Sequence, residues 1–143
     1  MIWVLDASVA LKWFFQARTN ETHSDIAVAL LQGYVNGHHR LLAPPHFVAE
    51  VSAVLAREVP HIMQAALAQL LALAIPVVDE PAVYGRALHL SHTLQHHLFD
   101  TLYHAVALQT PGAVLMTADD RYWRVARSQG QVQRLADGVG ELR

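Results

Sequence analysis

The sequence contains no cysteine and only one lysine, and charged residues make up just 15% of its 143 residues. The absence of cysteine excludes disulfides, thiolate nucleophiles and cysteine-ligated zinc or iron sites. The net charge of −2 argues against a protein that coats nucleic acid without sequence preference, because such a protein needs a strong positive field. Seven glycines and six prolines are too few for a fibrous or low-complexity chain.

Long hydrophobic runs are missing as well. The apolar start is interrupted by Asp6 and Lys12, and no small-residue cleavage signal follows it. The longest other candidate, residues 62–78, contains two glutamines and a proline and is shorter than the ~18 apolar residues of a spanning helix. We therefore expect no membrane segment and a cytoplasmic location.

Apolar residues make up 53% of the chain, enough for a sizeable core, and the length fits a single domain over residues 1–143. Short apolar runs alternate with longer stretches of helical spacing. The predicted strands are residues 2–5, 41–43, 75–78, 113–116 and 132–135. Strands that are apolar on both faces and alternate with helices predict an α/β fold, with a central parallel five-stranded sheet in a three-layer α/β/α arrangement.

Acidic residues are scarce, and several follow predicted strands. Asp6 comes directly after the first strand, where it also fits the N-cap of the next helix. Asp119 and Asp120 follow the run that ends at Thr117. Thr117 and Asp120 have the spacing of a capping box, which explains Asp120 and leaves Asp119 without a local role.

Two further acids lie on predicted helices. Asp100 stands in the first turn of a helix over residues 99–109, where the helix dipole favours an acid. Glu50 falls on the same apolar stripe as Phe47 and Val54. A carboxylate facing a core is costly unless it is paired or binds a metal. Both alternatives stay open at this position: an ion pair with Arg57, or a metal ligand.

The topology predicts where these acids meet. In an open parallel sheet, ligands bind beyond the carboxyl ends of the strands. Four carboxylates gathered there repel one another unless cations are bound, and Mg²⁺ or Mn²⁺ favours such all-oxygen sites. The predicted catalytic and metal-binding residues are Asp6, Glu50, Asp100 and Asp119. Such a site suits phosphodiester hydrolysis, and we expect Ser8 and Thr117 to orient its carboxylates or waters.

The same residues carry a family resemblance over nearly the whole chain. The sequence resembles PIN-domain proteins, and within that superfamily it is most similar to VapC-type toxins of bacterial toxin–antitoxin pairs. The matching segments are Val4–Ser8, Ala43–Pro44 through Glu50 to Leu55, Phe99–Tyr103 with Ala105 and Ala107, and Leu115–Arg121. Each motif is short, but the four occur in order and in matching predicted secondary structure.

The resemblance implies a Mg²⁺- or Mn²⁺-dependent endoribonuclease that acts as a toxin on an RNA substrate, forms a homodimer and is inhibited by a cognate VapB-like antitoxin. The alanine- and leucine-rich stretch 63–73 also favours a homodimer, because it carries more apolar surface than one sheet face needs. The alternative is a non-catalytic PIN-like module that binds RNA or protein, since a fold alone does not establish an activity.

Other polar residues have two interpretations each. Arg121 and Arg124 follow Asp119 on one predicted helix and would hold RNA phosphates or form a solvated face. His104 stands one turn after Asp100 and would be an extra ligand or a packed side chain. Three histidines share helical spacing and would form a polar helix face or, less in keeping with their surroundings, a zinc site: His89, His92 and His96.

Overall fold

The structure, a computed structural model, describes residues 1–18 and 20–138, so the last five residues of the predicted domain 1–143 lie outside the described residues. A parallel sheet forms its centre, with the strand order β2-β1-β3-β4. The strands are β1 (Ile2–Leu5), β2 (Arg40–Leu42), β3 (Ala113–Thr117) and β4 (Val132–Arg134). The α/β class and the parallel sheet flanked by helices are confirmed.

The two central strands are the most buried. Trp3 and Val4 of β1 and Leu115 and Met116 of β3 have almost no exposed surface. Val4 pairs with Leu115 and Leu5 with Met116 in parallel register. Burial on both faces explains why these strands are continuous apolar runs rather than alternating ones.

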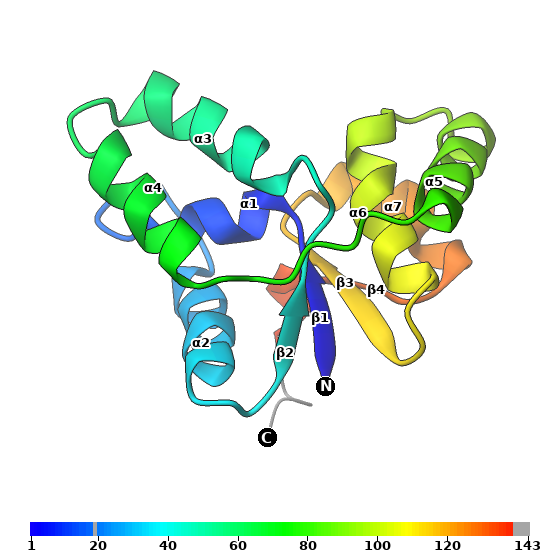
Figure 1. Ribbon diagram of the computed structural model, residues 1–143, viewed down its shortest axis with the longest axis horizontal. Helices are drawn as coiled ribbons and strands as arrows, with labels where there is room; N and C mark the ends of the chain where they lie inside the picture. The colour runs from blue at the N-terminus through cyan, green and yellow to red at the C-terminus, as the bar shows by residue number, and fades with distance from the viewer. Residues whose placement is uncertain (19, 139–143) are drawn as a thin grey trace.

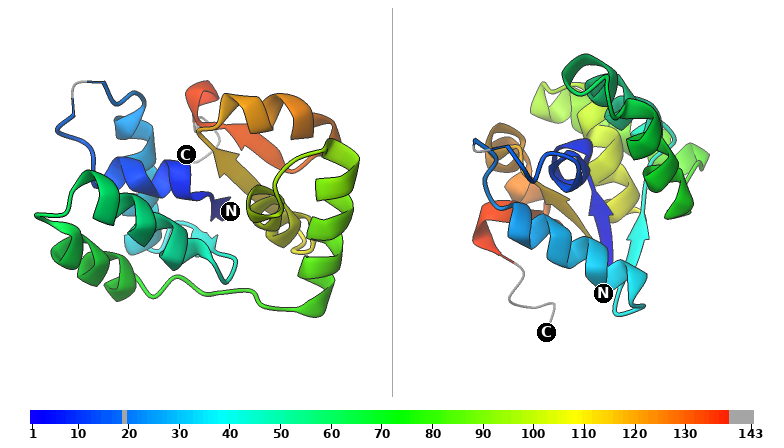
Figure 2. Two further views of the ribbon diagram at one scale, coloured as in Figure 1. Left: turned by 90° about the horizontal axis from the view of Figure 1, so that it is seen from above. Right: turned by 90° about the vertical axis from the view of Figure 1, so that its left-hand side faces the viewer.

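Helices flank the sheet, and they separate into two groups in Figure 1. The first group contains α1 (Ala7–Ala10), α2 (Ser24–Val35), α3 (Phe47–Glu58) and α4 (Met63–Ala72), with the 3₁₀ turn η1 (Leu11–Trp13) after α1. The second group contains α5 (Pro81–Leu94), α6 (Leu98–Leu108) and α7 (Asp120–Ala126). Two further 3₁₀ turns, η2 (Arg127–Gln129) and η3 (Leu135–Asp137), flank β4. Helix α6 packs against both central strands, and Figure 2 shows the two groups from above and from one side.

The predicted strand over residues 75–78 is not part of the sheet, so the sheet has four strands instead of five. This segment forms a single parallel bridge, between Val77 and Ala43 just after β2. Ala43 donates its N–H to the carbonyl of Pro76 at 3.0 Å and accepts from the N–H of Val78 at 2.9 Å. Pro76 has no N–H to donate, which prevents a longer ladder. No described helix has both the length and the apolar character needed to cross a membrane.

Candidate active site

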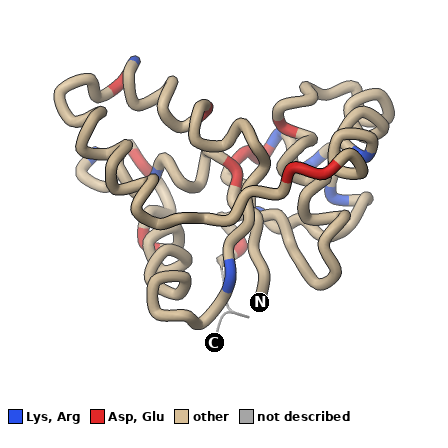
Figure 3. Tube along the Cα trace, in the orientation of Figure 1, with Lys and Arg blue, Asp and Glu red and all other residues tan. Residues whose placement is uncertain are grey.

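The candidate site lies at the carboxyl ends of β1 and β3. These two strands are neighbours, but the chain leaves them in opposite directions, from β1 toward β2 and from β3 toward β4. A parallel sheet forms a ligand-binding crevice at such a divergence. Asp6 directly follows β1, and Asp119 comes two residues after the end of β3. Acidic segments gather near the centre of the molecule, between the two groups of helices (Figure 3).

Asp6 is held by hydrogen bonds from both central strand ends. Its Oδ1 accepts from the backbone N–H of Ser8 at 2.9 Å and from the Ser8 hydroxyl, and its Oδ2 accepts from the Thr117 hydroxyl. The Ser8 hydroxyl also accepts from the N–H of Ala118 at 3.1 Å, which ties the two loops together. Ser8 and Thr117 therefore fix the orientation of the Asp6 carboxylate.

Asp119, not Thr117, caps α7. Asp119 Oδ1 accepts from the backbone N–H groups of Arg121 and Tyr122 at 3.0 and 3.1 Å. Thr117 is still within the strand and uses its hydroxyl on Asp6 and on the N–H of Asp119. The capping-box interpretation of Thr117 and Asp120 is therefore wrong, and Asp120 is an exposed residue of the first turn.

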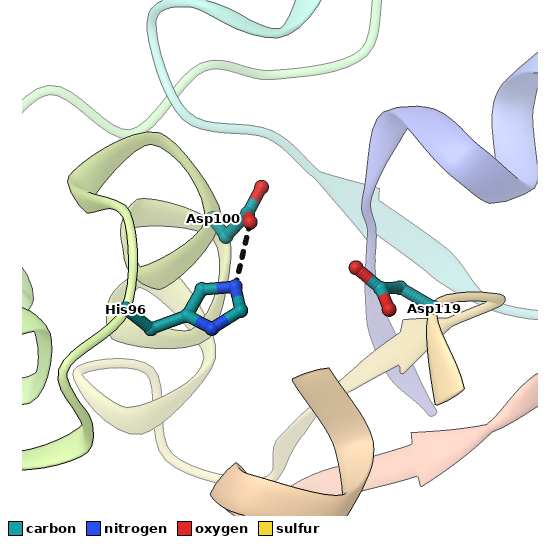
Figure 4. A group of neighbouring side chains, drawn as sticks. All are labelled: His96, Asp100 and Asp119. Carbon is teal, nitrogen blue, oxygen red and sulfur yellow. Dashed lines mark hydrogen bonds and ion pairs between the residues drawn. The ribbon is translucent and has the colours of Figure 1, made fainter. Parts of the chain in front are cut away.

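Asp100 lies in the first turn of α6, and its carboxylate faces His96. Asp100 Oδ2 lies 2.8 Å from His96 Nε2. Figure 4 shows the His96 ring beside Asp100, with Asp119 across an open space from this pair. His96 follows the end of α5, so it does not share a helix face with His89 and His92. Both of those side chains are exposed on α5, and the polar-face interpretation therefore holds for them alone.

Glu50 reaches the site from α3. Its Oε1 accepts from the Tyr103 hydroxyl at 3.2 Å, and its Oε2 lies 3.6 Å from His46 Nε2. His46 Nε2 also donates to the backbone carbonyl of Phe99 at 2.8 Å, which connects the start of α3 to α6. The proposed partner of Glu50, Arg57, instead contacts Glu58 at 3.4 Å. The interpretation of Glu50 as the ion-pair partner of Arg57 is therefore wrong.

The carboxylates influence one another electrostatically. Burial raises the pKa of Asp6 to about 6, although the hydrogen bonds from Ser8 and Thr117 oppose this shift, and the charge of Asp100 adds to it. Burial also raises the pKa of Glu50, with smaller contributions from Asp100 and Asp6. Within the described part of the chain, no lysine or arginine forms an ion pair with any of the four acids. The site therefore concentrates negative charge without a lysine or arginine to balance it.

The donor set suits a divalent cation. One ligand atom each from His96, Asp100 and Asp119 lies within 4.8 Å of the other two. A cation with bonds of about 2.1 Å holds its ligand atoms at most about 4.2 Å apart, so small side-chain adjustments suffice. Asp6 and Glu50 are outside this tight group, but Asp100 affects the pKa of both. The residues therefore fit a metal that binds mainly oxygen.

His104 is a packed side chain rather than a ligand. It is fully buried, and its Nε2 donates to the carbonyl of Gly130 at 2.8 Å. Because a carbonyl only accepts, the proton of the neutral ring is on Nε2, and Nδ1 accepts from the Tyr122 hydroxyl at 2.9 Å. Burial lowers the pKa of His104 and keeps the ring neutral.

The two predicted phosphate-binding residues are exposed on the helix that Asp119 caps. Arg121 and Arg124 are exposed on α7, directly after the capping residue Asp119. Arg124 Nε donates to the backbone carbonyl of Asp120 at 3.3 Å. Neither guanidinium forms an ion pair among the described residues, so both are free to meet an anionic ligand.

The sequence motifs missed three residues that line this site: His96, His46 and Tyr103. His96 precedes Asp100 by four residues, a spacing that could have paired the two across the start of α6. His46 likewise precedes Glu50 by four residues. No local pattern indicates the Tyr103 hydroxyl, because its contact with Glu50 joins residues 53 positions apart.

Comparisons with known proteins identify the family and support the fold. The family described as "PIN domain" matches residues 3–128. A chain of the crystal structure of VapBC2 from Rickettsia felis, bound to a DNA fragment from their promoter, superposes with a TM-score of 0.68. The alignment covers 94% of this chain and 98% of that chain at 15% sequence identity, so it supports the fold alone. No curated protein matches the sequence.

Proposed function

Because the chain belongs to the PIN-domain family, we propose that it is an endoribonuclease that depends on Mg²⁺ or Mn²⁺. The observation that carries the proposal is the convergence of acids from four separate elements at the ends of β1 and β3, without a compensating lysine or arginine among the described ion pairs. The proposed catalytic and metal-binding residues are Asp6, Glu50, Asp100 and Asp119. A purely structural cluster has no reason to keep such repulsion.

Each residue has a proposed task in phosphodiester hydrolysis. A bound divalent cation lowers the pKa of water and stabilises negative charge on the phosphate. The carboxylates hold that cation, and Ser8 and Thr117 fix the orientation of Asp6 through their hydrogen bonds. Arg121 and Arg124 bind RNA phosphates at the rim and position the chain without reading its sequence.

We propose that this ribonuclease is a VapC-type toxin that acts in the cytoplasm and is inhibited by a VapB-like antitoxin. Support comes from the motifs quoted from the sequence and from the likeness to a chain of the VapBC2 structure. The proposed homodimer would use apolar surface around α4, where Leu71 and Ile62 are exposed.

The test is cleavage of single-stranded RNA by the purified chain with Mg²⁺, Mn²⁺ or EDTA. We expect cleavage only with a divalent cation. The Asp6→Asn variant keeps the side-chain volume but removes the charge, so the rate should fall by ~10²–10³. The matched control is Asp120→Asn, which changes an exposed neighbour of the site and should keep most of the activity.

Activity that survives both EDTA and Asp6→Asn would contradict the proposal. The second candidate function, a PIN-like module that binds RNA or protein without cutting, predicts RNA binding that is insensitive to EDTA and no cleavage of any RNA. The rim arginines on α7 are compatible with either function, so cleavage is the property that separates them.

A further inference from the structure

His96 is placed firmly beside the carboxylates by the turn between α5 and α6. Gln95 ends α5 in a left-handed conformation, with φ of 52°. The N–H of His96 then donates to the carbonyl of Ser91 at 3.1 Å, and the Ser91 hydroxyl donates back to the carbonyl of His96. These two bonds fix the backbone from which the imidazole projects, so the ring position is built into the turn.

The ring itself is also held in place. The side chain of His96 is only 13% exposed, and its ring packs edge-on against Tyr122 with centroids 4.9 Å apart. Tyr122 is fixed in turn, because its hydroxyl donates to His104 and its N–H donates to Asp119. A solvent-exposed histidine side chain would lose more conformational freedom on binding a ligand than the packed His96 ring does.

The imidazole faces the acids rather than the solvent. Nε2 lies 2.8 Å from Asp100 Oδ2, and one ring nitrogen lies within 4.8 Å of the ligand atoms of both aspartates. Figure 4 shows the Asp100–His96 pair on one side of an open space and Asp119 on the other. One nitrogen and two carboxylates from different elements thus surround a common point.

We propose that His96 is a nitrogen ligand of the metal site and that it biases this site toward Mn²⁺ over Mg²⁺. The inference rests on the proposed function, because it assumes that the carboxylates bind a divalent cation. Mg²⁺ is a hard cation that favours oxygen ligands and keeps its waters. Mn²⁺ also binds carboxylates, but as a first-row transition-metal cation it accepts an imidazole nitrogen more readily than Mg²⁺ does. A site with a histidine among its carboxylates therefore gains affinity for Mn²⁺ that an all-carboxylate site does not have.

The competing explanation is that His96 only positions Asp100 through their hydrogen bond. The two roles differ in what His96→Gln does, because glutamine keeps a side-chain N–H donor but is a poor metal ligand. A positioning role predicts a similar loss of affinity for both cations. A ligand role predicts a selective loss for Mn²⁺.

The experiment measures Mn²⁺ and Mg²⁺ affinities of the full chain by titration calorimetry, together with the pulsed electron paramagnetic resonance spectrum of bound Mn²⁺. We expect the wild type to bind Mn²⁺ more tightly and to show nitrogen hyperfine coupling. His96→Gln should remove this coupling and weaken Mn²⁺ binding about tenfold or more, within the range typical of a lost metal-site partner, with a smaller change for Mg²⁺. His89→Gln, which replaces an exposed histidine of α5, should behave like the wild type.

Three results would count against the inference or its premise. Mn²⁺ binding without nitrogen coupling would overturn the ligand role of His96 while leaving the metal site intact. Equal weakening for both cations in His96→Gln would show that the residue positions Asp100 instead. Binding of neither cation above the level of Asp100→Asn would overturn the metal site itself, and with it the proposed function.

Discussion

Asp119 uses its two carboxylate oxygens for different tasks. Oδ1 caps α7 by accepting from two backbone N–H groups. Among the described residues, Oδ2 has no hydrogen-bond partner, and the carboxylate lies across from Asp100 and His96. The same residue therefore starts a helix and lies across from Asp100 and His96, so its capping role and its proposed role in the site are separable by substitution.

Two substitutions of Asp119 separate capping from metal binding. Asp119→Ala removes the cap and should lower the free energy of unfolding by about 1 kcal/mol. Asp119→Asn keeps an N-cap oxygen and should unfold close to the wild type in the presence of EDTA. Both variants should lose the stabilisation that Mn²⁺ gives the wild type. The free energy of urea unfolding, measured with and without Mn²⁺ for the wild type and both variants, tests these expectations. If Mn²⁺ stabilised Asp119→Asn as much as the wild type, Asp119 would not be a residue of the metal site.

The raised pKa of Asp6 predicts that this residue destabilises the folded protein by an amount that depends on pH. The carboxyl titrates near 3.8 in the unfolded chain and near 6 in the folded one. Between these values the folded state binds more protons, so this group lowers the free energy of unfolding as the pH rises from about 4 to about 6, with no further change above. At neutral pH without divalent cations, Asp6→Asn should therefore be more stable than the wild type, by up to about 3 kcal/mol.

Unfolding of both proteins in urea with EDTA, at a series of pH values, measures this difference. The advantage of Asp6→Asn should shrink as the pH falls from about 6 to about 4. A difference that does not vary across this window would mean that Asp6 has no raised pKa in the folded protein.

At the scale of elements, a buried hydrogen-bond chain joins α6, α7 and the turn before β4. His104 of α6 accepts from Tyr122 of α7 and donates to the carbonyl of Gly130. Tyr122 also contacts the ring of His96, and its backbone N–H donates to Asp119. These hydrogen-bonded residues therefore help to hold His96 and Asp119 in place. His104 therefore has a structural role.

His104→Phe tests that role, because it keeps an aromatic ring of similar size but leaves the Tyr122 hydroxyl and the Gly130 carbonyl without their partner. We expect the free energy of unfolding to fall by about 1–3 kcal/mol. Chemical denaturation gives the value. His92→Phe changes an exposed histidine of α5 and is the control. An unchanged stability for His104→Phe would mean that water replaces both bonds.

Most elements were predictable from apolar periodicity and from the prolines and glycines at which helices and strands begin or end. The run at residues 2–5 is a strand because it is apolar on both faces, and Pro81 begins α5 as expected of a first-turn proline. The apolar composition of residues 75–78 predicts a strand, but it takes no account of the N–H that Pro76 lacks, and the segment forms only a single bridge. The expected position of the acids follows from the predicted topology, and the four-residue spacing of His46 to Glu50 and of His96 to Asp100 could have paired these residues. The contact of Glu50 with Tyr103 instead depends on long-range packing that no local pattern records.

At the scale of the whole molecule, the divergence between β1 and β3 gathers residues from both groups of helices at one edge. Apolar side chains remain exposed elsewhere, notably Leu71 on α4 and Val77 after it, at 56% and 54%. Exposed apolar side chains of this kind mark association surfaces in soluble proteins when they are contiguous. The proposed homodimer places them at the interface.

Light scattering with size-exclusion chromatography tests the homodimer. We expect the mass of two chains for the wild type at micromolar concentration. Leu71→Glu should shift the protein toward the monomer, because it buries a charge at the proposed interface. Leu88→Glu alters an equally exposed leucine on α5, away from α4, and should leave the dimer intact. A wild-type monomer would refute the dimer.

The central claim is that the carboxylates at the ends of β1 and β3 hold a divalent cation. Anomalous X-ray diffraction from crystals soaked in Mn²⁺ locates such an ion directly. We expect a Mn²⁺ peak at bonding distance, about 2.1 Å, from Asp100 and Asp119, with Asp6 and Glu50 facing it. A peak elsewhere in the molecule, or none at this edge of the sheet at saturating Mn²⁺, would contradict it.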